Sequence, residues 1–467
     1  MEESETVSSL FDTHAHLDDR RFDSDREEVI ERARGAGVEQ IITVACWDAE
    51  QGFDAALEIA EKNDAMYAAI GIHPHDARLV GEETFQQIQS LAGREKVIAI
   101  GETGLDYHYD NSPREVQREA FRSHIRLARS LNLPLIVHTR EADTDTLAIL
   151  KEEGAGETGG VFHCFSGDYD MATECLDMGF LLSFTGIVTF PGATALHEVV
   201  KKIPVERMAV ETDCPYLAPV PCRGKRNEPA YVVETAKRIA ALKGLSLDDV
   251  ARITTLNAQG LFGIGSRERK PEIAYRIRDS LYLAVTNRCN NFCTFCAKQS
   301  SFTVKGHYLR LRYEPTAKDV MAAIGPDPLQ YKEIVFCGYG EPLIRLDLVR
   351  EVGAALKERG CTVRINTDGL ANLVYERNIL PEISFIDALS VSLNAPDSES
   401  YQRLVKTPFG EKSFPAIIDF LKEARKHIGK VTATVVAIPG LDIEACRRLA
   451  EEEIGVTFRV REYNEVG

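Results

Sequence analysis

The sequence predicts an α/β protein of two successive barrels, a (β/α)8 TIM barrel followed by a partial (β/α)6 barrel. Three observations carry this prediction. Residues 10–263 contain eight apolar, β-branched segments that alternate with helical patterns, and residues 281–460 contain six more. A polar, charged stretch with Gly and Pro at 263–276 separates the two series. Eight β-α units over about 250 residues match the size of a TIM barrel.

The first series has the alternation of strands and helices that a parallel barrel requires. Runs such as residues 26–40 and 116–132 repeat apolar residues at intervals of three and four, which is typical of amphipathic helices. The predicted strands are LFDTH (10–14), QIITVAC (40–46), MYAAIGIH (66–73), VIAIGETG (97–104), PLIVHT (134–139), VFHCF (161–165), LLSFTGIV (181–188) and MAVET (208–212).

The second series repeats this alternation in a shorter stretch of chain. We expect a first domain at 1–264, a linker at 265–276 and a second domain at 277–467. The predicted strands of the second domain are LYLAVTN (281–287), EIVFCGYG (333–340), TVRINTDG (362–369), ALSVSLNA (388–395), VTATVVAI (431–438) and VTFRV (456–460).

The composition indicates a reduced, cytoplasmic protein. Its first residues have no secretory signal, and no apolar run approaches the roughly 20 residues of a membrane span, so no membrane association is expected. The odd number of cysteines, 11 in 467 residues, argues against a disulfide framework. The net charge of −17 falls in residues 1–270, because residues 271–467 hold 26 basic and 26 acidic residues. This argues against a broad basic surface for nucleic acid.

Polar side chains gather at the carboxyl-terminal ends of the first-series strands, where a parallel barrel has its active site. His14 and His16 are two residues apart on an extended backbone, so both imidazoles point the same way and can bind one metal ion. Each histidine alone is better explained as a core or surface residue. Six ligand-type residues together predict a site for two divalent ions bridged by a carboxylate. They are His14, His16, Glu102, His138, His163 and Asp213.

Residues 10–263 also carry motifs that resemble, in order, the TatD family of metal-dependent deoxyribonucleases. The resemblance implies a metal-dependent hydrolase barrel that cleaves DNA phosphodiesters, with the six residues above as ligands and Glu102 as the bridge. It further implies Asp213 as a base that orients water and His75 on the substrate side. The motifs are DTHAHLD (12–18), GIHPH (71–75), GETGLDY (101–107), VHTRE (137–141), HCFSG (163–167), ETDCPYLAP (211–219), RGKRNEP (223–229) and TTLNAQGLFG (254–263).

Several points about this barrel stay open at the sequence level. Family members commonly use Mg, whereas histidine-rich ligation suits Zn or Mn. The same barrel and ligands serve amidohydrolase-type enzymes that cleave amides, esters or lactones, although the full-length resemblance favours the nuclease. The basic loop 223–227 either contacts phosphate or is a solvated loop. Cys214 stands where the family often has Ser, next to a ligand.

The second series contains the sequence CNNFCTFC directly after its first strand. Cys289, Cys293 and Cys296 can bind three irons of a [4Fe–4S] cluster and leave the fourth iron open. A structural zinc site would need a fourth ligand, and the nearest candidate, His307, lies eleven residues further on. Three core cysteines are the other alternative. The spacing favours the cluster.

This spacing, with Phe295 before the last cysteine, resembles the radical S-adenosylmethionine (SAM) superfamily. The resemblance implies SAM on the open iron and an electron donor such as flavodoxin or ferredoxin. Gly338-Tyr339-Gly340-Glu341-Pro342 is similar to the superfamily's Gly-Gly-Glu-Pro motif, whose backbone binds SAM, with Tyr339 as a variation. Weaker matches, each equally well explained as a structural turn, are Asn366, Ser392, Asn394 and residues 438–440.

The sequence therefore predicts a bifunctional enzyme, a TatD-like DNase or exonuclease fused to a radical SAM enzyme of unspecified substrate. The compact second half resembles the radical SAM proteins that are associated with TatD nucleases. A non-enzymatic sensor of iron or oxygen is the remaining hypothesis. Open coordination sites argue against it, because a scaffold needs none.

Overall fold

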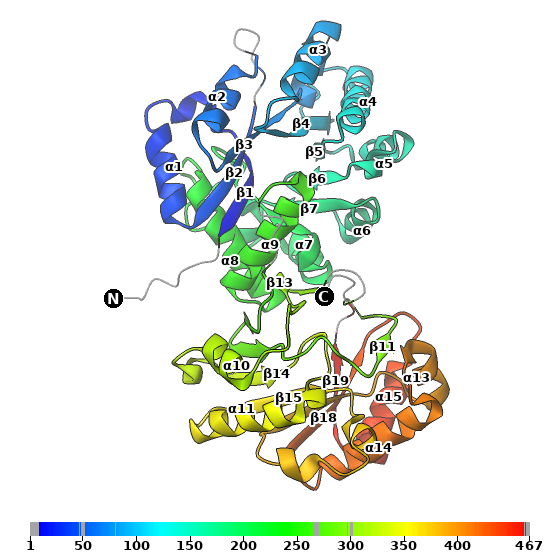
Figure 1. Cartoon of the computed structure of the whole chain (residues 1–467). Coiled ribbons are helices and arrows are strands. Elements are labelled where there is room, and N and C mark those ends of the chain that lie inside the picture. The colour runs from blue at the N-terminus through cyan, green and yellow to red at the C-terminus, as the bar shows by residue number, and fades with distance from the viewer. Residues whose placement is uncertain are drawn as a thin grey trace. The chain divides into compact units, whose positions relative to one another are not determined.

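The chain, seen here as a computed structural model, forms two compact units, Met1–Ser266 and Arg267–Gly467 (Figure 1). Each unit is built of parallel strands joined by helices, so the predicted fold class is confirmed. No helix in the described part of the chain is long and apolar enough to cross a membrane. The structure describes residues 9–45, 47, 52–79, 81–265, 270–296, 298, 302–461 and 463.

The first unit contains an eight-stranded sheet whose strands follow one another in chain order and pair in parallel. Its last strand returns to its first through a parallel bridge between Ala15 and Cys214, which brings the two ends of the sheet together. The strands are β1 (Leu10–Ala15), β2 (Val38–Val44), β3 (Met66–Ile70), β4 (Val97–Asp106), β5 (Leu135–Arg140), β6 (Gly160–Phe162), β7 (Phe180–Phe184) and β8 (Met208–Val210).

Helices connect these strands and cover the outside of the sheet, as the blue to green coils in Figure 1 show. The α-helices are α1 (Arg26–Gly35), α2 (Asp54–Lys62), α3 (Glu82–Leu91), α4 (Arg114–Leu131), α5 (Asp143–Glu152), α6 (Tyr169–Asp177), α7 (Thr194–Lys202), α8 (Val232–Lys243) and α9 (Leu247–Phe262). Short 3-10 turns are η1 (Arg20–Phe22), η2 (Pro74–Leu79), η3 (Ala155–Glu157), η4 (Gly186–Thr189), η5 (Val205–Arg207) and η6 (Pro229–Tyr231).

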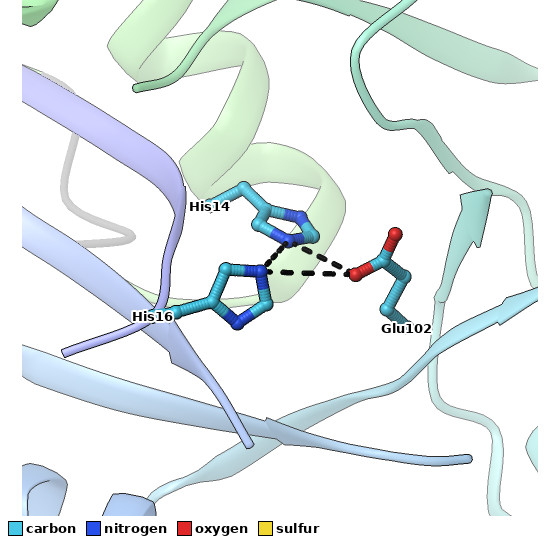
Figure 2. A group of neighbouring side chains, drawn as sticks. All are labelled: His14, His16 and Glu102. Carbon is cyan, nitrogen blue, oxygen red and sulfur yellow. Dashed lines mark hydrogen bonds and ion pairs between the residues drawn. The ribbon is translucent and has the colours of Figure 1, made fainter. Parts of the chain in front are cut away.

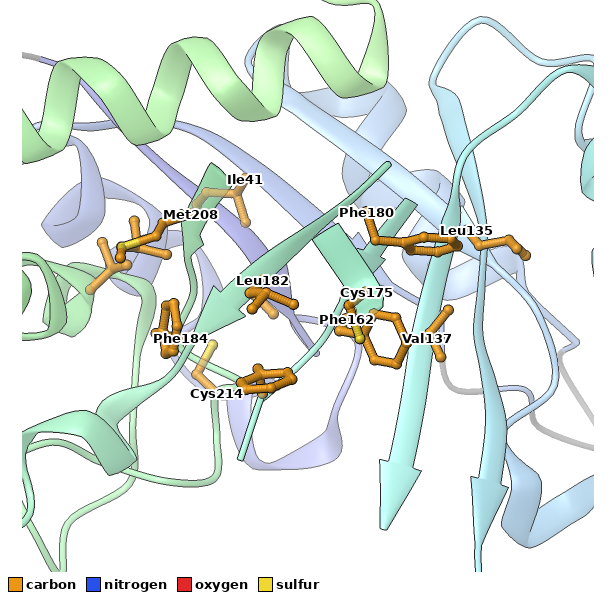
Figure 3. Packing of buried hydrophobic residues seen from close by; sticks show 14 of the residues in the cluster. Ile41, Leu135, Val137, Phe162, Cys175, Phe180, Leu182, Phe184, Met208 and Cys214 are labelled. Atoms are coloured by element: carbon orange, nitrogen blue, oxygen red, sulfur yellow. The ribbon is translucent and has the colours of Figure 1, made fainter. Parts of the chain in front are cut away.

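Two layers of apolar side chains hold this unit together. The outer layer lies between strands and helices, and Figure 3 shows part of it, with the rings of Phe162 and Phe180 5.4 Å apart. The inner layer contains one or more residues from each strand together with Ala258 and Phe262 of α9, so α9 packs against the inner layer. Burying one such aromatic side chain contributes about 1.5–3 kcal/mol.

Local signals in the sequence fix the ends of α9. Ser246 caps its first turn by accepting a hydrogen bond from the amide of Asp249, whose carboxylate accepts from the amide of Ser246 in return. Gly263 ends the helix with φ +66°, a conformation that glycine adopts without steric cost. The helix that packs against the inner layer therefore has sequence-encoded limits at both ends.

The second unit has a seven-stranded sheet in the order β19-β18-β16-β15-β14-β10-β9. Its six parallel strands match the six predicted ones. β9 (Ala274–Ile277) was not predicted; it pairs antiparallel with β10 and begins inside the stretch that we expected to be linker. The other strands are β10 (Ser280–Leu283), β14 (Glu333–Phe336), β15 (Val363–Thr367), β16 (Ala388–Ser392), β18 (Lys430–Val436) and β19 (Thr457–Arg461).

Helices and two small strand pairs complete the second unit. One segment, η12 (Leu449–Ile454), is a π-helix, a form that is frequent at functional sites. The pairs are β11 (Phe292–Cys293) with β17 (Val405–Lys406), and β12 (Thr303–Val304) with β13 (His307–Tyr308). The helices and turns are α10 (Ala317–Ile324), η8 (Pro328–Gln330), η9 (Pro342–Arg345), α11 (Leu346–Glu358), α12 (Ala371–Val374), η10 (Leu380–Ile383), α13 (Ser398–Leu404), η11 (Gly410–Lys412), α14 (Ser413–Ala424) and α15 (Ile443–Arg448).

Candidate metal centre and cysteine site

The six predicted ligands of the first unit lie together at the carboxyl-terminal ends of its strands. His14 comes from β1 and His16 directly follows it, Glu102 and His138 come from β4 and β5, and the last two follow β6 and β8. The register of β1 against β2 shifts between Asp12 and Ala15. Such an irregularity can redirect side chains beside a site. The expected common direction of the two imidazoles is observed.

Figure 2 shows three members of this cluster, His14, His16 and Glu102, with ring nitrogens and a carboxylate oxygen that point toward one another. Nε2 of His14 lies 3.3 Å from Nε2 of His16 and 3.3 Å from Oε2 of Glu102. Nδ1 of His16 lies 3.1 Å from the Val44 carbonyl, and when Nδ1 donates its proton to that oxygen, Nε2 carries the lone pair of the ring toward the other donors. Oδ1 of Asp213 is 3.4 Å from His16 Nε2.

Glu102 divides the cluster because its two oxygens face different partners. Oε2 faces His14 and His16, at 3.3 and 3.9 Å. Oε1 lies 2.8 Å from Nδ1 of His138 and 3.7 Å from Nε2 of His163. Nitrogen ligands about 2.1 Å from a zinc ion in tetrahedral geometry are about 3.4 Å apart, so the spacing of these donors fits cations between them.

Charges in the cluster are strongly coupled. Burial raises the pKa of Glu102, but nearby imidazoles led by His163 outweigh it and hold this pKa well below its ordinary value. Burial lowers the pKa of His163, but carboxylates led by Glu211 outweigh it and raise the pKa to about 9. Burial lowers the pKa of His73 to about 3. The cluster therefore holds ionised carboxylates in a buried place, where a cation would be stabilised.

The close approach of β4 to β5 and the turn at Asp213 position these side chains. A Cβ on Gly104 would lie 1.9 Å from the His138 carbonyl oxygen, and one on Gly101 would lie 2.5 Å from that of Ile136. Only glycine fits at both positions. Asp213 has φ +58°, and its amide donates to the His14 carbonyl at 2.9 Å. Cys214, next to it, is fully buried, and burial raises its pKa well above the ordinary value.

Three residues that we assigned no role belong to the same network. His73 Nε2 lies 3.6 Å from Glu102 Oε1. Glu211 is fully buried, with Oε1 2.7 Å from His163 Nδ1 and 2.7 Å from the amide of Cys164. Asp106 contacts His138 Nε2 at 3.2 Å. Each lies within a quoted motif, but only contacts between distant segments reveal what it touches.

His75, predicted on the substrate side, does not touch Glu102 in the structure. Its Nε2 lies 3.0 Å from Oδ2 of Asp106, the oxygen that also contacts His138. Asp106 thus lies between His75 and the converging donors, and the His75 side chain is 29% exposed.

The basic loop 223–227 is largely structural. Arg226 forms a two-pronged ion pair with Asp25, at 2.8 and 2.7 Å. The Asn227 side-chain amide donates to the carbonyls of Thr212 and Tyr216, which fixes the segment beside the predicted ligand Asp213. Arg223 and Lys225 are exposed, so these two side chains are the ones in this loop that could contact a phosphate.

The three cysteines of the second unit lie near one another without converging on one point. Cys293 is on β11, which pairs with β17. Burial raises the pKa of Cys293, and so do the neighbouring thiols of Cys289 and Cys296. Within the described residues, the groups whose donor atoms all lie within 4.8 Å of one another include none of these sulfurs. Separate sulfurs suit a cubane cluster, in which each thiolate binds its own iron.

His307, the alternative zinc ligand, is engaged elsewhere. Its Nδ1 lies 2.9 Å from Oε2 of Glu272, and its Nε2 lies 2.8 Å from the Arg276 carbonyl. Both nitrogens have partners, so the zinc alternative lacks its fourth ligand in this structure.

The GYGEP segment packs tightly against the end of β10. A Cβ on Gly340 would lie 2.1 Å from the Thr286 carbonyl oxygen. Glu341 is 3% exposed, and its carboxylate accepts hydrogen bonds from the amides of Leu343 and Asp368. Its side chain is thus used internally, and the backbone is what this segment offers to a ligand. The Tyr339 hydroxyl donates to the Thr303 carbonyl at 2.5 Å.

The weaker SAM positions differ from one another. Asn366 accepts a hydrogen bond from Arg364 at 2.7 Å, so it has a structural partner. Asn394 is 5% exposed with φ +60°, and its side-chain oxygen has no hydrogen-bond partner among the described residues. Ser392 ends β16 and is half-buried. Residues 438–440 line a cavity of about 470 Å³ together with Pro396, Arg403 and Leu449.

Phe295, the last predicted SAM contact, packs against the core of the second unit as a partly buried side chain. It anchors the cysteine loop, since it lies between Cys293 and Cys296.

Comparisons with known proteins match these two units separately. The model of the TatD related DNase family matches residues 11–263, and that of the radical SAM superfamily matches residues 283–452. The uncharacterized metal-dependent hydrolase YabD of Bacillus subtilis (strain 168) is 52% identical over 260 residues, 55% of this chain and 99% of that protein. The 3'-5' ssDNA/RNA exonuclease TatD of Citrobacter rodentium (strain ICC168) is 35% identical over 262 residues, 55% of this chain and 98% of that protein.

A solved structure agrees with the fold of the first unit. The TatD homologue YJJV of Escherichia coli K12 is 31% identical, with a TM-score of 0.52. The match covers 55% of this chain and 98% of that one.

Proposed function

Because the chain belongs to the TatD related DNase family through residues 11–263 and carries a radical SAM domain at 283–452, we propose a specific activity for each unit. The first unit hydrolyses phosphodiester bonds of nucleic acid, with DNA as the expected substrate, from an end of the strand. The second unit binds a [4Fe–4S] cluster and SAM and acts on a substrate whose identity is left unspecified.

One observation carries the first proposal. The two oxygens of Glu102 face two different sets of donors, His14 with His16 and His138 with His163. This arrangement supports two divalent cations, Mg, Mn or Zn, with Glu102 between them and Asp213 beside the first pair. Such a pair supplies Lewis acidity toward a phosphate and lowers the pKa of water.

The protein's own groups then orient water and substrate. Burial raises the pKa of Asp213, but imidazoles led by His163 outweigh it and lower this pKa, so Asp213 is ionised at neutral pH. It accepts a hydrogen bond from the attacking water and takes its proton as the oxygen bonds to phosphorus and the leaving sugar oxygen departs. Solvent protonates the leaving oxygen. Asp106 holds His75 at the open side of the cluster, where it contacts the substrate.

The test uses end-labelled single-stranded DNA with Mg²⁺ or Mn²⁺. Glu102→Gln keeps the size of the side chain and removes its charge, so we expect cleavage to fall by more than about 100-fold. Metal content, measured on the same samples, should fall with it, whereas Glu228→Gln, a buried carboxylate paired with Arg32, should retain both. A wild type that contains metal and cleaves no nucleic acid overturns the proposal, and amide, ester and lactone substrates are then tested in its place.

The second proposal rests on the three separate thiols and the backbone of the GYGEP segment. Anaerobic reconstitution should give four irons per chain, and the reduced cluster should give an electron paramagnetic resonance signal that changes on addition of SAM. Reduction, by dithionite or by flavodoxin or ferredoxin as the expected electron donor, should release 5′-deoxyadenosine. Absence of SAM cleavage by a fully loaded cluster overturns the radical activity and favours the sensor hypothesis.

We further propose that the protein works in the cytoplasm. The described cysteines are all free thiols, and an open cluster is sensitive to oxygen, so both suit a reducing compartment. Localisation of a tagged full-length chain by cell fractionation tests this.

A further inference from the structure

Two exposed tyrosines lie beside the metal cluster of the first unit. Tyr109 follows β4 and is 55% exposed, and Tyr216 follows β8 and is 48% exposed. Among the described Phe, Tyr and Trp residues of this unit, only Tyr109, Tyr169 and Tyr216 are exposed, and Tyr109 and Tyr216 lie near the carboxyl-terminal ends of barrel strands, where the active site of a barrel lies. Exposed aromatic rings at such a position are available to a ligand.

Each tyrosine ring stands nearly perpendicular to a histidine of the network. The rings of Tyr109 and His75 have centroids 5.3 Å apart, at 87°. The rings of Tyr216 and His16 have centroids 6.2 Å apart, at 81°. Both tyrosines therefore touch the site itself, through different histidines.

These two histidines are at opposite ends of one chain of contacts. His16 lies 3.9 Å from Glu102, and Glu102 lies 2.8 Å from His138. His138 contacts Asp106 at 3.2 Å, and Asp106 contacts His75 at 3.0 Å. One tyrosine thus lies beyond each end of the contacts that surround Glu102.

An arginine covers one face of each ring. The guanidinium of Arg140 lies 4.8 Å from the centroid of Tyr109, and that of Arg21 lies 4.2 Å from the centroid of Tyr216. Arg21 is also held by the carboxylate of Asp19, through two hydrogen bonds of 2.9 and 2.7 Å. Arg140 is exposed and makes no ion pair among the described residues, so its charge is available to a phosphate.

We propose that Tyr109 beside His75 and Tyr216 beside His16 are two base-stacking positions that select single-stranded nucleic acid. This inference rests on the proposed phosphodiester hydrolysis. Aromatic side chains bind unpaired bases by stacking, without sequence preference, because every base has a π face. A base inside a duplex is stacked and paired already, so it reaches these rings only after unpairing. Arg140 supplies a phosphate contact beside Tyr109, and Arg21 stiffens Tyr216 without adding net charge.

Binding of a short fluorescein-labelled oligothymidylate to the full-length chain tests this, in the Glu102→Gln background to prevent cleavage. Tyr109→Ala and Tyr216→Ala should each weaken binding by about 5- to 150-fold, the range for loss of one stacked base. The phenylalanine variants of both should bind as the parent does, because the ring remains. Tyr169→Ala is the matched control: Tyr169 is 43% exposed and covered by Lys202 at 4.9 Å, but Lys202 does not belong to the metal cluster.

A change on the DNA side separates stacking from damage to the protein. An oligonucleotide with one abasic position should bind the parent protein more weakly than the intact oligonucleotide does. Tyr216→Ala or Tyr109→Ala should not weaken the binding of this abasic oligonucleotide any further, because the missing base and the missing ring belong to the same contact. Arg140→Gln should reduce the slope of log affinity against log salt concentration by about the amount that one phosphate contact contributes. Arg21→Gln should leave this slope unchanged.

The outcomes are distinguishable. Alanine variants that bind like the parent, or duplex that binds as well as single strand, overturn the stacking proposal and leave the hydrolase proposal intact. Additive losses from the abasic position and the alanine variants also overturn it. If the metal-loaded wild type cleaves no nucleic acid, the proposed function itself fails, and both proposals fall together.

Discussion

The two sites of this chain differ in how much of each site the protein builds by itself. In the first unit, the donor atoms of buried His14, His16 and Glu102 already lie within a few ångströms of one another. In the second unit, Cys289 is exposed, Cys293 and Cys296 are half-buried, and the three sulfurs lie apart, as thiolates that each bind a separate iron do. The first site is organised by a barrel, the second by a loop. Strand ends hold the donors of the first site in a buried place, whereas the loop leaves the thiols of the second site partly open to solvent.

The largest expected effect separates the two sites. Cys293→Ser removes one of only three thiolates, so we expect loss of the cluster and no detectable SAM cleavage. Nuclease activity of the first unit should stay within about 2-fold of wild type, since its site needs no cluster. Iron content, visible absorption and DNA cleavage on the same preparation measure this. Cys361→Ala, a buried thiol just before β15, should keep the iron; a parallel loss of DNA cleavage in Cys293→Ser would contradict the comparison.

A smaller effect concerns the support of the first site. Glu211→Gln removes the negative charge that faces His163 Nδ1 at 2.7 Å. Carboxylate partners of metal-binding histidines typically contribute 10- to 100-fold in metal affinity, so we expect Mn²⁺ binding to weaken by about that factor. Isothermal titration calorimetry measures it directly. Unchanged affinity would mean that the ligands, not their partners, organise the site.

The stability of the first unit should also depend on pH. His124 is fully buried, its Nε2 accepts a hydrogen bond from the Ile72 amide, and burial lowers its pKa to about 4 from 6.5. Between these values the unfolded chain binds a proton that the folded chain does not, so stability falls as pH falls. The contribution is about 2 kcal/mol between pH 7 and pH 5. Denaturant unfolding of His124→Gln should lack this part of the pH dependence; an equal slope in both proteins would refute it.

The smallest expected effect concerns Cys214, where the sequence resemblance led us to expect Ser. Cys214→Ser replaces a buried thiol with a hydroxyl, and the Thr212 side chain is within hydrogen-bonding reach. We expect a change of less than about 1 kcal/mol in stability, because the buried hydroxyl keeps a partner. DNA cleavage should change by less than about 3-fold. A large loss of cleavage in a folded variant would assign Cys214 a direct part in the site.

Sequence patterns predicted the frame of both units well. Hydrophobic periodicity located all fourteen parallel strands, because strand burial leaves a local signature. Membership of both families, inferred from ordered motifs, is confirmed by the family matches. The convergence of the predicted ligands followed from parallel topology alone, because strand ends of a barrel meet at one face. Their role as ligands stays a prediction.

Contacts between distant segments were not predictable in the same way. Glu211 touches His163 across 48 positions of sequence, and no local pattern encodes that contact. The buried carboxylate of Glu341 accepts a hydrogen bond from the amide of Asp368, 27 positions later, which the local sequence does not reveal. β9 was missed because a short antiparallel edge strand lacks the run of apolar residues that marks a buried one. Propensity and period describe single segments, whereas these features arise from packing.

The seam between the first and last strands of the barrel has a consequence for the synthesis of the protein. His14 and His16 leave the ribosome early, yet the carboxylate of Asp213 and the backbone bridge from Ala15 to Cys214 come two hundred positions later. A nascent chain that stops before this seam holds histidines without the partner that completes their environment. The hydrolytic centre can therefore form only once the whole ring of strands has been made and closed. An unfinished chain therefore lacks the carboxylate of Asp213, and we expect it to be inactive in the proposed hydrolysis.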